Sequence, residues 1–220
     1  MNGLAGKRMG ERFRNDRACG DKMPNLIDDL RKARQNAATS ECIAVCRRGL
    51  CADYPRGSEE WYAVRINLAT LLSQDDKTNE LTSQGLEEAI DLYRAIIDAF
   101  QDATDSREVA NAAMGLGWAY YLRVQGSPDD NLQSAQDAFY RATKYYTRER
   151  DQYTWACLQD ALGLIFSGMN SQNHPHAQDT AIERYREALK VFSKESYPDE
   201  WVEINEKIDL LKEKKGDRSI

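Results

Sequence analysis

Apolar residues recur along most of this chain at spacings of three and four, as in helices with one buried face. The clearest segment runs from Tyr153 to Phe192, and its first half carries Trp155, Leu158, Leu162, Ile165 and Phe166. A polar stretch from Ser167 to Asp179, rich in Gly, Asn, Ser and Pro, predicts a loop. Residues 181–189 return to the helical pattern. The segment therefore predicts two antiparallel helices joined by a loop.

This pattern is repeated at a fixed spacing of 46 to 48 residues. Three places of the repeat are filled in turn by Leu68, Leu116 and Leu162, by Ala89, Ala135 and Ala181, and by Tyr93, Phe139 and Tyr185. A unit of this size cannot bury its own apolar face, so it must stack on a copy of itself. The sequence predicts an all-α fold, an α-solenoid of stacked antiparallel helix pairs.

The repeat also divides the chain. We expect a mobile N-terminal segment over residues 1–23, a helical repeat domain over 24–215 and a frayed tail over 216–220. Near the start of the domain, Ala38, Cys42, Val45 and Cys46 predict the second helix of a degenerate first unit, with residues 26–37 as its partner. The last copy, from Trp201 to Leu211, lacks a second helix. Its predicted outer face is charged and carries Glu206, Lys207, Lys212, Glu213 and Lys214.

The repeat resembles the tetratricopeptide repeat (TPR) family, in which Leu-Gly-x-x-Tyr on one helix faces Ala-x-x-x-Phe/Tyr-x-x-Ala on the next. Two units carry this pattern: Leu116, Gly117 and Tyr120 with Ala135, Phe139 and Ala142, and Leu162, Gly163 and Phe166 with Ala181, Tyr185 and Ala188. The resemblance covers roughly residues 38–213 and implies stacked helix pairs, with a bare backbone at the glycines for close helix approach.

The period is longer than the family's, which is about 34 residues. The extra residues fall in the loop between the helices and at the start of the first helix. There Trp61, Trp155 and Trp201 stand seven residues before the Leu place, and Val109 takes that position in the other unit. Long-period repeats of this form resemble, more loosely, bacterial TPR arrays found next to CHAT protease domains.

Composition narrows the classes of function. The chain is 41% apolar and 30% charged, and its net charge of −6 argues against a phosphate-binding surface and so against nucleic acid. No apolar run is long enough to cross a membrane, and residues 1–24 lack the apolar core of a secretory signal. The five cysteines are odd in number and irregular in spacing, which favours a reducing cytoplasm over a disulfide framework.

Residues that could carry chemistry are few. His174 and His176 have no third ligand nearby in sequence, so we read them as part of a polar connector. The pairs Asp28-Asp29, Asp75-Asp76 and Asp129-Asp130 fit helix starts or polar loops better than an acid–base couple. Cys42 and Cys46 fit the core, and Gly115 and Gly117 fall within a helix, where they favour helix packing over phosphate binding. We therefore predict no catalytic, cofactor or metal site, and no enzyme.

If the helices stack as the resemblance implies, the first helix of each unit lines a concave groove. We expect the residues facing it to be Ile66, Thr70, Ser73, Asn111, Met114, Trp118, Tyr121, Asp160, Leu164 and Ser167. Trp118 and Tyr121 are large rings on the side opposite the predicted core, where they would either anchor a partner or pack against another segment. The groove places carry no Lys or Arg, and Asn67 and Asn111 alone cannot neutralise a terminal carboxylate, which disfavours that ligand.

The sequence thus predicts a non-enzymatic TPR-like scaffold that binds a protein or peptide partner through apolar anchors, with self-association left open. A second reading is a regulatory or sensor subunit of a separate effector, such as a CHAT-type protease. A helical metal enzyme using His174 and His176 is a third, and RNA binding is disfavoured by the acidic charge.

Overall fold

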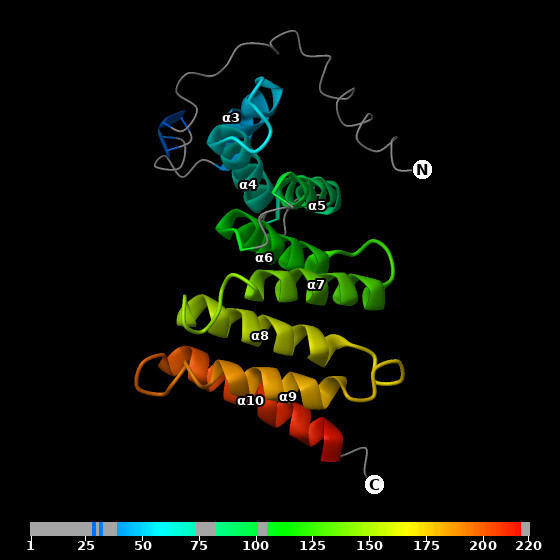
Figure 1. Cartoon of the computed structure of the whole chain (residues 1–220). Helices are drawn as coiled ribbons and strands as arrows, with labels where there is room; N and C mark the ends of the chain where they lie inside the picture. The colour runs from blue at the N-terminus through cyan, green and yellow to red at the C-terminus, as the bar shows by residue number, and fades with distance from the viewer. Residues whose placement is uncertain (1–27, 30, 33–38, 74–81, 101–104, 217–220) are drawn as a thin grey trace. The chain divides into compact units, whose positions relative to one another are not determined.

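The computed structural model describes residues 28–29, 31–32, 39–73, 82–100 and 105–216. Regular structure in these ranges is helical, without a strand, which confirms the all-α prediction for this part of the chain (Figure 1). The predicted mobile segment 1–23, most of the predicted helix 26–37, Asp75 and Asp76, and the tail after Gly216 lie outside the described residues. Within these ranges, none of the helices combines the length and the apolar character that a membrane span requires.

The chain forms two compact units, with the division after Phe100. The first contains α3 (Thr39–Cys51), α4 (Glu59–Ser73) and α5 (Thr82–Ala99). The second contains α6 (Arg107–Leu122), α7 (Pro128–Thr143), α8 (Gln152–Gly168), α9 (Ala177–Ala188) and α10 (Pro198–Gly216). Within each unit, helices that follow one another in the chain pack against each other, as the run from α6 to α10 in Figure 1 illustrates.

Side-chain caps set where several of these helices begin. The side chains of Ser106, Ser127 and Asp151 each accept a hydrogen bond from a backbone N–H in the first turn of α6, α7 and α8. Asp129 and Asp130 lie in the first turn of α7, as predicted, where the helix dipole favours carboxylates. This carboxylate pair therefore belongs to a helix start.

The loop between α8 and α9 is shorter than the predicted loop 167–179. Ser167 and Gly168 are the last residues of α8, and the Ser167 hydroxyl donates to the carbonyl oxygen of Leu164, at 2.8 Å. At the other end Ala177 is buried, so α9 begins there and its polar neighbours belong to its first turn. The prediction from polar composition assigned the end of α8 and the start of α9 to the loop.

The repeat places form the core of both units, as predicted. The three Leu, three Ala and three ring places are all buried, with the alanines fully enclosed. Trp61 and Val109 are buried at the start of their helices, whereas Trp155 and Trp201 are half-buried. Cys42 and Cys46 of α3 are buried too, which confirms them as core residues. Packing of these positions accounts for the strict spacing in the sequence.

Two glycines allow the second helix of a pair to approach the first. A Cβ added at Gly117 would lie 2.7 Å from Cε1 of Phe139, and one at Gly163 would lie 2.5 Å from Cε1 of Tyr185. Both distances are far below van der Waals contact. The rings of α7 and α9 therefore lie directly against the backbone of α6 and α8.

The last helix, α10, packs its apolar side on α9. Ile204, Ile208 and Leu211 belong to one buried cluster with Tyr185 and Phe192. Asp209 occupies the place that Gly163 holds in α8, and its exposed side chain pairs with Lys212. A ring could not lie against α10 at this place as it does against α8.

Candidate partner-binding face

A face built from α6, α8 and α10 is organised around the hydroxyl of Tyr185. The Tyr185 ring passes over Gly163 from α9, and its hydroxyl shares a hydrogen bond with Ser167. Burial raises the pKa of Tyr185 to about 12, and the charges of Lys207, Asp160 and Tyr121 also act on it. Side chains from α6, α8 and α10 are therefore near enough to Tyr185 to influence its titration, and the Lys207 ammonium lies 5.7 Å from the centroid of its ring. We call this surface the first-helix face.

Asp160, Lys207 and Glu203 form an ionic group on this face. The Lys207 ammonium lies 2.9 Å from Oδ1 of Asp160 and 2.8 Å from Oε1 of Glu203. Only 23% of the Lys207 side chain and 28% of the Asp160 side chain are exposed, whereas Glu203 is 67% exposed. Lys207 was predicted on the outer face of the last helix. That prediction is wrong, because its long side chain lies along α10 and bonds to α8.

The pKa values of this group show how the charges are balanced. Burial acts against the Lys207 ammonium, but hydrogen bonds to Glu203 and Asp160 hold its pKa above the ordinary value. For Asp160, burial raises the pKa and, with repulsion from Glu203, outweighs the opposing hydrogen bond from Lys207. Two carboxylates thus share one ammonium, and the group keeps a negative excess.

Trp118 and Tyr121 are the large rings of this face, at 39% and 37% exposure. They contact each other edge-on, with centroids 5.9 Å apart. Trp118 also lies edge-on to the core ring of Phe139, at 5.3 Å. One edge of the Trp118 indole therefore belongs to the core packing, while another edge is open to solvent.

The other predicted groove residues are divided between the two units. In the second unit, Asn111 accepts a hydrogen bond from the Tyr146 hydroxyl, and Met114 and Leu164 are half-buried. Ile66 and Thr70 belong to α4 in the first unit, where the Thr70 hydroxyl donates to the Ile66 carbonyl oxygen. Of the predicted residues, Tyr121 of α6 and Asp160 and Ser167 of α8 have Tyr185 as a common neighbour.

Leu210 of α10 holds the same repeat place as Leu164 and was not predicted. It follows Leu164 by 46 residues, as Leu164 follows Trp118, and it is 56% exposed. On α10 it shares a side with Glu203 and Lys207 at helical spacing. We call Trp118, Leu164 and Leu210 the apolar row. The spacing of 46 residues would have predicted Leu210 as the next member of this row.

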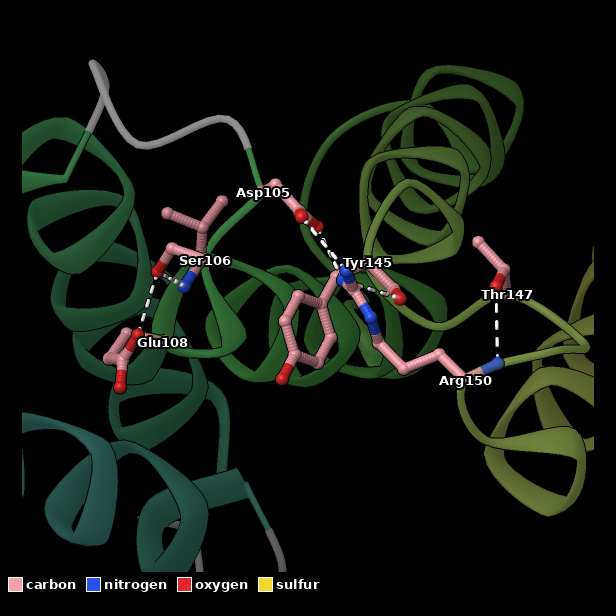
Figure 2. Close-up of polar contacts among 7 residues, drawn as sticks. Asp105, Ser106, Glu108, Tyr145, Thr147 and Arg150 are labelled. Atoms are coloured by element: carbon pink, nitrogen blue, oxygen red, sulfur yellow. Dashed lines mark hydrogen bonds and ion pairs between the residues drawn. The ribbon is translucent and has the colours of Figure 1, made fainter.

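A separate group of polar contacts fixes the start of α6 (Figure 2). The guanidinium of Arg150, in the loop before α8, binds both carboxylate oxygens of Asp105, with Nη2 at 2.9 Å from Oδ2. It also lies over the Tyr145 ring, 4.4 Å from the centroid, and Nη1 donates to the Tyr145 carbonyl oxygen. The hydrogen bond from Arg150 lowers the pKa of Asp105. These exposed contacts hold a loop to a helix start and leave no open site.

The two histidines lie in the loop between α8 and α9. His174 is half-buried, His176 is exposed, and both line an open pocket of about 370 Å³ with Gln133, Met169 and Thr180 among its walls. Asn173 ties this loop to α7 by donating to Asp129, at 2.8 Å. Among the residues that the structure describes, no three His, Cys, Asp or Glu side chains are grouped to hold a metal ion.

In comparisons with known proteins, no protein-family model, no curated protein and no solved structure matches this chain.

Proposed function

We propose that this protein is a non-enzymatic scaffold whose helix pairs stack as a TPR-like α-solenoid and whose first-helix face binds a protein or peptide partner. The observation that supports it best is the pair of rings on α6. Trp118 and Tyr121 each expose more than a third of their surface, and Leu164 and Asp160 of α8 are half-buried. Solvent-exposed large rings on such a face fit anchors for a partner.

The packing of Trp118 supports this role energetically. Its indole is held between Tyr121 and Phe139, so little side-chain entropy remains to be lost on binding. Truncation of an aromatic anchor at the centre of an interface typically costs at least about 2 kcal/mol. The rings therefore offer a rigid, partly apolar surface that needs no rearrangement to receive a partner.

Site-specific crosslinking tests the proposal. A photo-crosslinking amino acid at position 121 should form an adduct with a partner in lysate of the source cells, and the same amino acid at position 124 should not. Val124 is the matched control because it is apolar, 89% exposed and follows α6 directly. Trp118→Ala should abolish the adduct while circular dichroism stays unchanged. Equal adducts at both positions, or none at either, would contradict the proposal.

A further inference from the structure

We infer that the partner segment has an apolar end that lies on α6 and a basic end that lies on α10. This inference rests on the proposed function and specifies its ligand. It follows from a gradient along the first-helix face, which is aromatic and uncharged at α6, mixed at α8 and acidic at α10.

The α6 side of the face provides the apolar end. Its residues after the first turn carry no charge, and Trp118, Tyr121 and Leu122 are exposed there, Leu122 by 51%. Arg107 stands apart at the start of the helix. Packing of apolar groups of a partner against these side chains removes apolar surface from water, which favours binding. This end of the face suits Leu, Met or aromatic side chains of the partner.

The α10 side provides the acidic end. The helical periodicity puts seven residues on one side of α10. Apart from Leu210 they are charged: Asp199, Glu203, Glu206, Lys207, Glu213 and Lys214. Together with Asp160 of α8, this makes five carboxylates and two ammonium groups. Lys207 is already bonded to two of the carboxylates, and Asp209 and Lys212 neutralise each other beside the face. The excess of negative charge is therefore open to a partner.

Such a surface selects the sign of the partner's charge. Lys or Arg side chains gain from the exposed Glu203 and Glu206, whereas an acidic segment or a terminal carboxylate is repelled. A second copy of this chain would bring its own excess of carboxylates, since the net charge is −6. Charge complementarity thus favours a basic segment, with Leu210 as an apolar contact among the acidic residues.

Binding of two synthetic peptides to the full chain tests the inference. Both have Leu and Trp in the amino half, and the carboxyl half contains Lys in one and Glu in the other. Calorimetry should show binding of the Lys peptide alone, weakened by added salt. Glu203→Gln with Glu206→Gln should reduce its affinity roughly tenfold, about 1.4 kcal/mol. Glu149→Gln with Glu195→Gln, a matched pair of exposed loop carboxylates, should leave it unchanged.

The orientation of the bound Lys peptide, and its dependence on Leu210 of the apolar row, provide a second test. A spin label on the apolar end of the Lys peptide should broaden the indole N–H signal of Trp118, and one on the basic end should not. Leu210→Asp should weaken binding, whereas Val202→Asp, on another side of α10 and 47% exposed, should not. Equal affinity for the two peptides, no binding of either, or the reversed orientation would overturn the inference. Crosslinking at position 121 reports separately on the proposed function.

Discussion

Replacing Gly163 by alanine tests whether the ring of Tyr185 truly depends on a bare backbone. The added methyl carbon would meet three ring atoms of Tyr185 at 2.5, 2.6 and 2.9 Å. Carbon atoms in good contact are about 3.5–4.0 Å apart, so the ring or the helix has to move by roughly 1 Å. The ring is 1% exposed and its hydroxyl is bonded to Ser167, so it has little room.

Two opposing effects decide whether Gly163→Ala raises or lowers the free energy of unfolding. Overpacking of a filled core costs about 1–3 kcal/mol, and three close contacts with an enclosed ring place this case in the upper part of that range. Alanine in place of glycine within a helix returns about 1 kcal/mol. We therefore expect Gly163→Ala to lower the free energy of unfolding by about 1–2 kcal/mol. Ala69, at the equivalent place in α4, indicates that a methyl is tolerated where the helices are spaced for it.

Thermal and urea unfolding measure this change, with Gly168→Ala as the matched control on the same helix. A Cβ at Gly168 would meet Leu132 at 3.5 Å, an ordinary contact, so that variant should be neutral or slightly stabilising. Gly163→Ala should lower the midpoint by roughly 3–8 °C. In a Tyr185→Leu background the cost should disappear, with a coupling of about 1–2 kcal/mol.

The reasoning would be refuted by either of two results. Gly163→Ala could stabilise the protein as much as Gly168→Ala does, or its cost could persist unchanged when Tyr185 is leucine. The first would mean that α8 and α9 are not in close contact here. The second would mean that the cost arises from another neighbour.

Three further predictions concern titrating groups. Tyr185→Phe should lower the free energy of unfolding by about 1 kcal/mol near neutral pH. Because the pKa of Tyr185 in the folded protein is raised to about 12, its contribution to stability is present below pH about 10 and is lost towards pH 12. The stability of the variant should therefore fall less steeply with rising pH, and an unchanged alkaline profile would count against a buried hydroxyl. Lys207→Met should destabilise by about 1–2 kcal/mol at neutral pH and by less near pH 4, since Asp160, whose pKa burial raises, costs most when ionised; a penalty independent of pH would argue against the pair. Asp105 has a lowered pKa, so its contribution is present above the unfolded value and lost as pH falls through the folded one; Asp105→Asn should remove that acid dependence in unfolding measurements, and no change would show that the ion pair contributes nothing.

The core was predictable because packing imposes it at every repeat. Leu116 and Gly117 had to meet Phe139, and the same constraint acts on Gly163 and Tyr185. Helix boundaries were less predictable, since they depend on local bonds such as that from the Met169 N–H to the Phe166 carbonyl oxygen at the end of α8. Polar composition carries no information about such local bonds.

The candidate face was predicted only in part. The long side chain of Lys207 reaches a neighbouring helix, and the repeat spacing was applied to the core places of α10 but not to its surface. Lys207 was assigned to solvent because a charged residue on a last helix usually faces water, yet its ammonium bonds to Asp160 on a neighbouring helix. Leu210 was missed because α10 was compared with the other helices at core places, although the same spacing relates it to Leu164. The ionic group of this face therefore depends on a contact between α10 and α8 that helical spacing alone does not indicate.

The ring of the second helix determines what its first helix presents at the surface. In the two units whose core ring is a tyrosine, a serine stands five residues after the Leu place and contacts the tyrosine hydroxyl. Ser73 lies 3.4 Å from the Tyr93 hydroxyl, and Ser167 is bonded to Tyr185. Phe139 has no hydroxyl, so that place is free for Tyr121, and Trp118 packs on the ring directly. The exposed aromatic pair thus exists because the core ring beneath it is apolar. Core and surface are linked in this way, and the aromatic end of the face lies at the unit whose core ring is a phenylalanine and not a tyrosine.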